Sequence, residues 1–115
     1  MFEYAIDNRR IMERAYAALA AGDLHGFAEP LAPSLVESAF GQILHPFGVD
    51  VGDLRIDPRE LTVAPGRVVV TGLYRATTGP DGAELTAAFR HEWHVTSGVA
   101  WRLVHDSWGL RERRV

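Results

Sequence analysis

The last third of the chain constrains the fold most, because two alternating segments flank the dipeptide Ser97-Gly98. Residues 87–95 and 99–108 alternate in steps of two, which is typical of β-strands, and a two-residue loop of this composition is typical of a tight hairpin. Pairing Thr96 with Val99 sets the register. Four opposed pairs then share one face of the sheet: Val95 with Ala100, Trp93 with Arg102, His91 with Val104, and Phe89 with Asp106.

This register makes His91 and Asp106 diagonal neighbours among aromatic side chains. A carboxylate can fix the tautomer of a neighbouring imidazole, and an apolar environment raises the pKa of a carboxyl group. We therefore predict that Asp106 transfers a proton and that His91 orients or assists it. Each residue also has a structural interpretation, Asp106 as a hydrogen-bond acceptor at a strand end and His91 as a core histidine. The predicted substrate-contacting residues are Tyr16, Tyr74, Phe89, Trp93, Arg102 and Trp108.

Composition excludes several chemistries. The chain has no Cys, and all twelve of its basic residues are Arg. Thiolate and Schiff-base catalysis and a phosphate-binding lysine are therefore excluded. The five His residues show no chelating spacing, and no glycine-rich turn leads from a strand into a helix, so we expect no metal and no cofactor.

Charge and hydropathy limit the partners. A net charge of -3 argues against nucleic acid. No apolar run reaches membrane-spanning length, and Asp7, Arg9 and Arg10 stand where a signal peptide needs apolar residues. We expect a cytoplasmic protein with no nucleic-acid or membrane partner. A chain of 115 residues that is 47% hydrophobic suits one domain over residues 1–115.

The order of predicted elements is helical first and then extended. Helical spacing predicts a helix over residues 4–21, and Asp23 is a candidate cap for a second helix over residues 24–31. Residues 35–40 are predicted as a first strand, and residues 41–57 support no assignment. Four further strands are predicted over residues 60–63, 67–77, 84–96 and 99–109. This is an α+β arrangement, in which the first helix covers a curved antiparallel sheet and closes a pocket.

Three segments in this order resemble the nuclear transport factor 2-like fold. They are residues 17–27, which contain Ala-Gly-Asp-Leu, residues 67–75, and residues 89–93 followed by Asp106. Within that superfamily the chain resembles the SnoaL-like polyketide cyclases, with steroid Δ-isomerase as a more distant relative. The resemblance implies a cone-shaped α+β barrel, a hydrophobic small-molecule substrate and cofactor-independent ring closure in bacterial secondary metabolism. It also maps the acid/base Asp and the neighbouring His of these cyclases onto Asp106 and His91.

The chain departs from the family in three places. Residues 41–58 are too rich in Pro and Gly to predict the third helix that SnoaL-like chains commonly carry. The carboxylate base of the isomerases has no counterpart at Ser38 or Ala39, and Tyr16 lies one residue from the position of their oxyanion-binding tyrosine. Isomerisation is therefore less favoured than cyclisation. Epoxide hydrolysis or cyclisation, dehydration, and a non-catalytic ligand-binding or dimerisation module of the same fold stay open.

The register also predicts a pocket and an interface. The pocket should lie between the first helix and the inner sheet face, with a lining of Tyr16, Phe89, His91, Trp93, Val104 and Asp106. The outer face should present three apolar side chains, Leu73, Trp101 and Leu103. A contiguous apolar surface of this kind predicts a homodimer through the outer face of the sheet.

Overall fold

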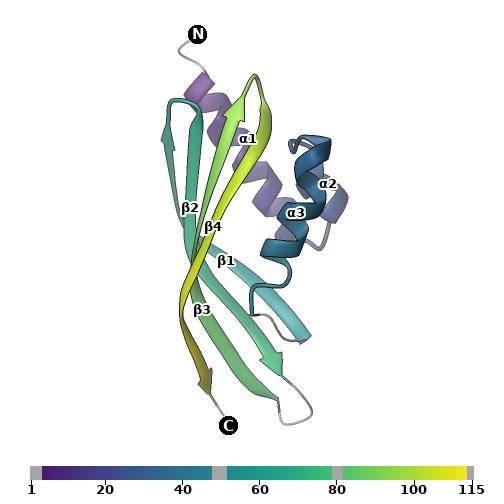
Figure 1. Cartoon of the computed structure of the whole chain (residues 1–115), viewed down its shortest axis with the longest axis vertical. Helices are drawn as coiled ribbons and strands as arrows, with labels where there is room; N and C mark the ends of the chain where they lie inside the picture. Colours follow the sequence, from purple (N-terminus) through teal and green to yellow (C-terminus); the bar gives the residue numbers. More distant parts are fainter. Residues whose placement is uncertain (1–3, 48–51, 79–81, 114–115) are drawn as a thin grey trace.

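A computed structural model of the chain describes residues 4–47, 52–78 and 82–113, with side chains described from residue 7 onward. Within these residues, three helices come first and four antiparallel strands follow in the spatial order β1-β2-β3-β4 (Figure 1). The elements are α1 (Tyr4–Ala20), α2 (Leu24–Ala28), α3 (Pro33–Ile43), β1 (Gly52–Ala64), β2 (Arg67–Thr78), β3 (Ala83–Thr96) and β4 (Val99–Arg113). The predicted α+β class is confirmed. The sheet is curved but open, because β1 and β4 each pair with one strand in the described part of the chain.

The two N-terminal helices follow the sequence pattern closely. Met12, Ala15 and Tyr16 are buried on one face of α1, as helical spacing of apolar residues requires. Gly22 has a φ of 77° and allows the chain to leave the helix. The Asp23 carboxylate accepts a hydrogen bond from the Gly26 amide at 2.9 Å, which confirms the predicted cap of α2.

The predicted first strand over residues 35–40 is wrong, because this segment belongs to α3. Leu35, Ala39 and Ile43 recur every four residues, and all three are buried. Pro33 stands in the first turn, where the absence of its amide proton costs no intrahelical hydrogen bond. A short apolar run does not separate a strand from one helical face, and here packing against the core selects the helix. The chain therefore has the third helix that its sequence did not predict.

The β3-β4 hairpin confirms the predicted turn and corrects the predicted register. Ser97 and Gly98 both have positive φ, and Thr96 pairs with Val99. Val95 then pairs with Ala100 while His94 pairs with Arg102, so Trp101 is an extra residue in a β-bulge. From Arg102 to Trp108, where a second register shift follows, the side chains of β4 therefore change face relative to the prediction. The observed pairs are Trp93 with Leu103, His91 with His105, and Phe89 with Ser107.

The bulge has two physical causes in the structure. The free edge of β4 at Ala100 is hydrogen-bonded to the segment after α2, because the Ala100 amide donates to the Pro30 carbonyl at 2.8 Å and the Ala32 amide donates to the Ala100 carbonyl at 2.7 Å. The bulge also turns Leu103 into the core and leaves Arg102 exposed. Burying leucine instead of an unpaired guanidinium is the favourable choice.

The helices cover one face of the sheet over part of its length (Figure 1). On β3 every second residue from Ala83 to Val95 is buried. Phe27 of α2 packs against Trp93 and Tyr16 in this core. The ends of β2, β3 and β4 that lie farthest from the N-terminus extend past the helices (Figure 1).

Candidate functional site

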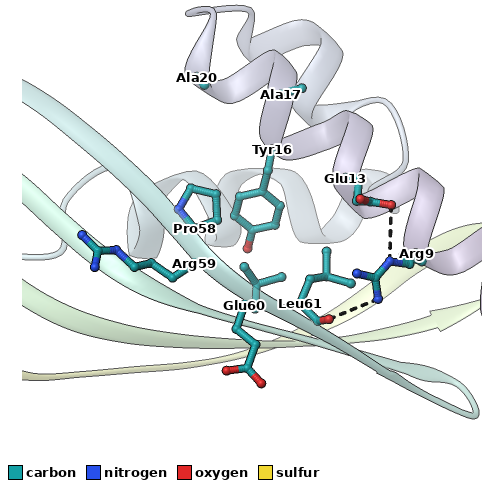
Figure 2. A pocket seen from close by; sticks show the side chains of 10 residues that line it. Arg9, Glu13, Tyr16, Ala17, Ala20, Pro58, Arg59, Glu60 and Leu61 are labelled. Atoms are coloured by element: carbon teal, nitrogen blue, oxygen red, sulfur yellow. Dashed lines mark hydrogen bonds and ion pairs between the residues drawn. The ribbon is translucent and has the colours of Figure 1, made fainter.

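A cleft of about 400 Å³ lies between α1 and β1. Figure 2 shows α1 on one side of it and β1 on the other. Its lining residues are Arg9, Glu13, Tyr16, Ala17 and Ala20 of α1, Pro58, Arg59, Glu60 and Leu61 of β1, and Val70 of β2. The cleft is therefore formed mainly by the first helix and an edge strand.

A bend in β1 shapes this wall. The register of β1 against β2 shifts between Pro58 and Glu60, so the strand bulges at Arg59. Pro58 pairs with Gly72, where an added Cβ would lie 2.8 Å from the Pro58 Cα and 2.9 Å from the Phe89 Cζ. Gly72 therefore permits a close approach of the two strands that a side chain would prevent.

Charged side chains surround the mouth of the cleft. Arg9 donates a hydrogen bond to the Leu61 carbonyl at 3.2 Å, which joins α1 to β1, and its Nε lies 3.6 Å from a Glu13 carboxylate oxygen (Figure 2). On the opposite wall Arg59 forms an ion pair with Asp57 at 3.1 Å. One guanidinium group thus stands on each wall, each paired with a carboxylate, and Glu60 adds a further carboxylate to the lining.

Tyr16 connects the cleft to the core. Its ring extends from α1 between Pro58 and Leu61 (Figure 2), and its residue surface is 5% exposed. The Tyr16 hydroxyl lies 2.5 Å from His91 Nδ1 and accepts a hydrogen bond from the Trp93 indole at 2.9 Å. His91 and Trp93 are fully buried.

The hydrogen bonds continue across the inner face of the sheet. His91 Nε2 lies 2.5 Å from the Tyr74 hydroxyl, and the same hydroxyl lies 2.7 Å from His105 Nε2. The His91 and His105 rings stack with centroids 5.1 Å apart. Among the described residues, no buried side-chain nitrogen or oxygen lacks a partner. This hydrogen-bonded chain of four side chains, Tyr16, His91, Tyr74 and His105, therefore satisfies polar groups whose burial without partners would destabilise the core.

The direction of these bonds follows from the donor inventory. The indole nitrogen of Trp93 can only donate, so the Tyr16 oxygen accepts from it and the Tyr16 proton is free to point at His91 Nδ1. His91 then carries its proton on Nε2 and donates to Tyr74, which donates in turn to His105 Nε2. The reverse direction would leave the Tyr16 proton without an acceptor.

Burial keeps the four side chains of this hydrogen-bonded chain neutral. It lowers the pKa of His91 to about 2, with a further contribution from the nearby His105. It raises the pKa of both Tyr16 and Tyr74 above the ordinary tyrosine value. It also lowers the pKa of the half-buried His105, although the neighbouring Asp106 carboxylate acts in the opposite direction. The two imidazoles are thus neutral at physiological pH.

The structure does not bring the predicted acid/base pair together. Asp106 pairs with Arg90 and is exposed on the outer face of the sheet, whereas His91 is buried on the inner face. The bulge at Trp101 is the reason, because it places His105 opposite His91, where the regular register has Val104, and Ser107 opposite Phe89, where it has Asp106. The predicted adjacency of Asp106 and His91 is therefore wrong.

The other predicted site residues fall into three groups. Tyr16 lies in the cleft wall. Tyr74, Phe89 and Trp93 are fully buried behind it. Arg102 and Trp108 are exposed on β4, and Val104 pairs with Glu92 on the outer face, so these three do not line the predicted pocket. Leu103, predicted to face outward, is buried on the inner face.

Sequence reasoning missed His105 and the two arginines of the cleft. His105 was assigned to the outer face because the hairpin was extended without a bulge. A usable signal was present, since the regular register required Arg102 to occupy the apolar face. Arg9 and Arg59 carry no local pattern that separates them from other surface arginines.

A second hollow of about 530 Å³ lies beside the cleft and shares Ala20 with it. Its walls are predominantly apolar: Leu19, Ala20, Gly22, Leu24, Leu44, Leu54, Arg55 and Ile56. The cleft, with its charged mouth, and this apolar hollow follow one another along β1. Within the described residues, no group of three or more metal-binding side chains is arranged around a common point, and no helix has the length and apolar character needed to span a membrane.

Comparison with solved structures identifies the fold. An NTF2-like protein from Burkholderia thailandensis superposes with a TM-score of 0.75 over 88% of this chain and 90% of its own, at 16% identity. TerC, co-crystallised with polyporic acid, gives a TM-score of 0.68 over 87% and 90% at 22% identity. TsrD from Streptomyces laurentii gives 0.69 over 89% and 88% at 14% identity. The chain has the nuclear transport factor 2-like (NTF2-like) fold.

No protein-family model matches the sequence, and no curated protein matches it either. The structural likeness therefore carries the assignment of the fold, and the chemistry of the site has to be argued from the residues themselves.

Proposed function

We propose that the chain is a cofactor-independent acid/base enzyme that acts on a small organic molecule in the cleft between α1 and β1. The main observation in support is that Tyr16, which lines the cleft, is hydrogen-bonded to the buried neutral imidazole of His91 at 2.5 Å. Solved structures of similar fold include TerC, which was co-crystallised with polyporic acid, and TsrD from Streptomyces laurentii. Ring closure of the SnoaL-like kind is the reaction class that we favour from the sequence resemblance.

We infer that Tyr16 exchanges a proton with the substrate, because it lines the cleft and its hydroxyl belongs to the buried hydrogen-bonded chain. Its hydroxyl can receive a proton at oxygen while passing its own proton to His91 Nδ1. Because the pKa of His91 is lowered, that nitrogen keeps its lone pair at neutral pH. Burial disfavours a cation at His91, so transfer to Nδ1 requires that His91 release its Nε2 proton at the same time. A positioned pair of this kind contributes about 10²- to 10⁴-fold to a rate.

The walls of the cleft indicate the chemical class of substrate. Ala17, Ala20 and Leu61 offer apolar contact, and Arg9 and Arg59 flank the entrance. A molecule with an apolar body and an oxygen-rich group fits this distribution. TerC, whose structure contains polyporic acid, supports an organic acid as the first probe.

Binding is tested by titrating the protein with polyporic acid and following backbone amide shifts by NMR. We expect shifts that cluster at Tyr16, Leu61 and Val70. The variant Ala17→Trp fills the cleft and should abolish them. Ala88→Trp, a matched substitution on the outer face, should leave them unchanged. Shifts that survive Ala17→Trp would place the ligand elsewhere and contradict the proposal.

Catalysis is tested with 2-tetralone, an enolisable ketone of suitable size, by measuring exchange of its α-protons in D₂O. Tyr16→Phe keeps the ring and removes the hydroxyl, so the exchange rate should fall by about 10²- to 10⁴-fold. Thr71→Val, which removes a hydroxyl from β2, should have no such effect. Asp106→Asn should change the rate by less than about tenfold, because a residue on the outer face cannot act as the positioned base. Binding without exchange would instead support a ligand-binding module.

A further inference from the structure

We propose that Tyr16, His91, Tyr74 and His105 form a proton relay that carries a proton from the cleft at β1 to His105 on the opposite edge strand. This inference rests on the proposed function for its substrate, but its central element is the continuous hydrogen-bonded chain. The four side chains come from α1, β3, β2 and β4, so the chain crosses the inner face of the sheet.

The geometry makes the side chains continuous at every step. The three contacts measure 2.5, 2.5 and 2.7 Å between heavy atoms, so each hydroxyl lies close enough to its imidazole nitrogen for a hydrogen bond. Each member can both accept and donate a proton, which a chain of this kind needs. Trp93 fixes the direction of the hydrogen bonds at the Tyr16 end, because its indole nitrogen donates to the Tyr16 hydroxyl and cannot accept a hydrogen bond.

The transfer balances atom by atom. A substrate C–H bond breaks, its electron pair stays on the substrate carbon, and the proton goes to the Tyr16 oxygen. The original Tyr16 proton moves to His91 Nδ1, and the His91 Nε2 proton moves to the Tyr74 oxygen. The original Tyr74 proton moves to His105 Nε2, and His105 then releases its Nδ1 proton to water.

His105 is suited to be the outer end of this chain. It is half-buried, unlike the fully buried His91, so its second nitrogen can reach solvent. The Asp106 carboxylate next to it in the chain favours the imidazolium that forms transiently. Substrate entry and proton release are thereby placed on opposite edges of the sheet, β1 and β4.

The first test needs no substrate. The rate at which the His91 Nε2 proton exchanges with water is measured by NMR with saturation transfer from the water signal. His105→Gln is the informative variant, because its amide can still hydrogen-bond to Tyr74 but cannot carry a proton. We expect the exchange of the His91 proton to slow by tenfold or more, with a similar loss in Tyr74→Phe.

The Trp93 indole proton is the internal control. It touches Tyr16 but is not transferred, so its exchange reports local opening of the core and should be unchanged in His105→Gln. If exchange of the Trp93 indole proton and of the His91 Nε2 proton slowed equally, local opening of the core would explain the effect, and the relay would be overturned. An unchanged His91 exchange rate in His105→Gln would also overturn it. Assignment of the His91 proton to Nδ1 in the wild type would contradict the direction of transfer.

The second test separates the relay from the proposed function. His105→Gln should lower the rate of α-proton exchange of 2-tetralone by tenfold or more while leaving polyporic acid binding unchanged. If the wild type does not catalyse this exchange but the His91 proton still depends on His105, the relay stands and the proposed function fails. If His105→Gln matches the wild type both in α-proton exchange of 2-tetralone and in exchange of the His91 Nε2 proton with water, His105 is only a hydrogen-bond partner.

Discussion

His91 and Glu92 are consecutive residues of β3, yet the two faces of the sheet stabilise them by opposite means. His91 points inward, where it is neutral and bonded to two tyrosine hydroxyls. Glu92 points outward, where His94 at 2.9 Å and Arg90 at 3.0 Å contact its carboxylate and lower its pKa. Arg67 adds a longer ion pair at 3.8 Å.

The contrast shows how burial decides between hydrogen bonds and charges. A charged group in the core would lose its hydration, so the inner face is satisfied by neutral donors and acceptors. On the outer face water lowers the cost of charge, and ion pairs form but contribute modestly. The two faces should therefore respond differently to substitution, pH and salt.

The largest effect is expected from His91→Phe. This change removes the shared partner of Tyr16 and Tyr74, so the Tyr16 proton loses its acceptor while Tyr74 keeps its hydrogen bond to His105. At about 1–3 kcal/mol for one unsatisfied group, the free energy of unfolding should fall by about 1–3 kcal/mol. Urea denaturation followed by Trp fluorescence measures it. A loss below about 1 kcal/mol would show that the inner chain does not stabilise the fold.

The pH dependence sharpens the same comparison. Below pH 6.5 the unfolded chain protonates His91, but the folded chain does so only near pH 2, so the unfolded state binds more protons. The free energy of unfolding should therefore fall with decreasing pH, by about 1.4 kcal/mol per unit from His91 alone. His105, whose pKa is also lowered, adds to this slope.

Glu92 acts in a different window, because its pKa is lowered from 4.5 and its stabilisation is lost only at more acidic pH. His91→Phe should therefore lower the slope of the stability curve from pH 6.5 down to about pH 2, and the slope that the variant keeps below pH 4.5 includes the contribution of Glu92. Denaturation at half-unit pH steps makes the distinction. An unchanged slope in the variant would show that His91 is not the titrating group.

The outer face should also carry the self-association that we propose. Trp101 is 49% exposed there, and its indole donates to Thr96 at 3.1 Å, which holds the ring in place. Trp101→Asp should shift a homodimer to the mass of one 12.7 kDa chain in light scattering. Gln42→Asp on α3 serves as the charge control. A wild type that is monomeric at micromolar concentration would exclude this interface.

The smallest effect is expected from Glu92→Gln. Partly exposed ion pairs contribute little and are screened by salt. The melting temperature should fall by much less than in His91→Phe, and the difference from the wild type should shrink in 1 M NaCl. A fall in melting temperature equal to that of His91→Phe, or one that salt does not reduce, would contradict the proposed difference between the two faces of the sheet.

The sequence predicted what depends on local pattern. The first helix, the Asp23 cap, the Ser97-Gly98 turn and the α+β class follow from spacing and turn chemistry. The errors arise where tertiary contacts decide. Leu35, Ala39 and Ile43 became a helical face through packing, and the register of β4 depends on hydrogen bonds between Ala100 and the segment around Pro30.

The candidate site was predicted in part for the same reason. Tyr16 and His91 lie where helix spacing and strand alternation put them, on the inner side of the fold. Asp106 was misplaced and His105 was missed by a single residue of register. The cleft itself depends on the approach of β1 to β2 at Gly72, a contact between segments whose pairing the sequence pattern did not reveal.

The bulge at Trp101 has a consequence for how this hairpin can change in length. Because His94 already pairs with Arg102, deleting Trp101 would shorten β4 without changing which residues point inward. A deletion between Leu103 and His105, in a regular part of the ladder, would turn the rest of the strand over and replace His105 by Asp106 on the inner face. Deletion at the bulge thus leaves the set of inward-facing side chains unchanged. A deletion between Leu103 and His105 instead exchanges the His105 imidazole for the Asp106 carboxylate on the inner face.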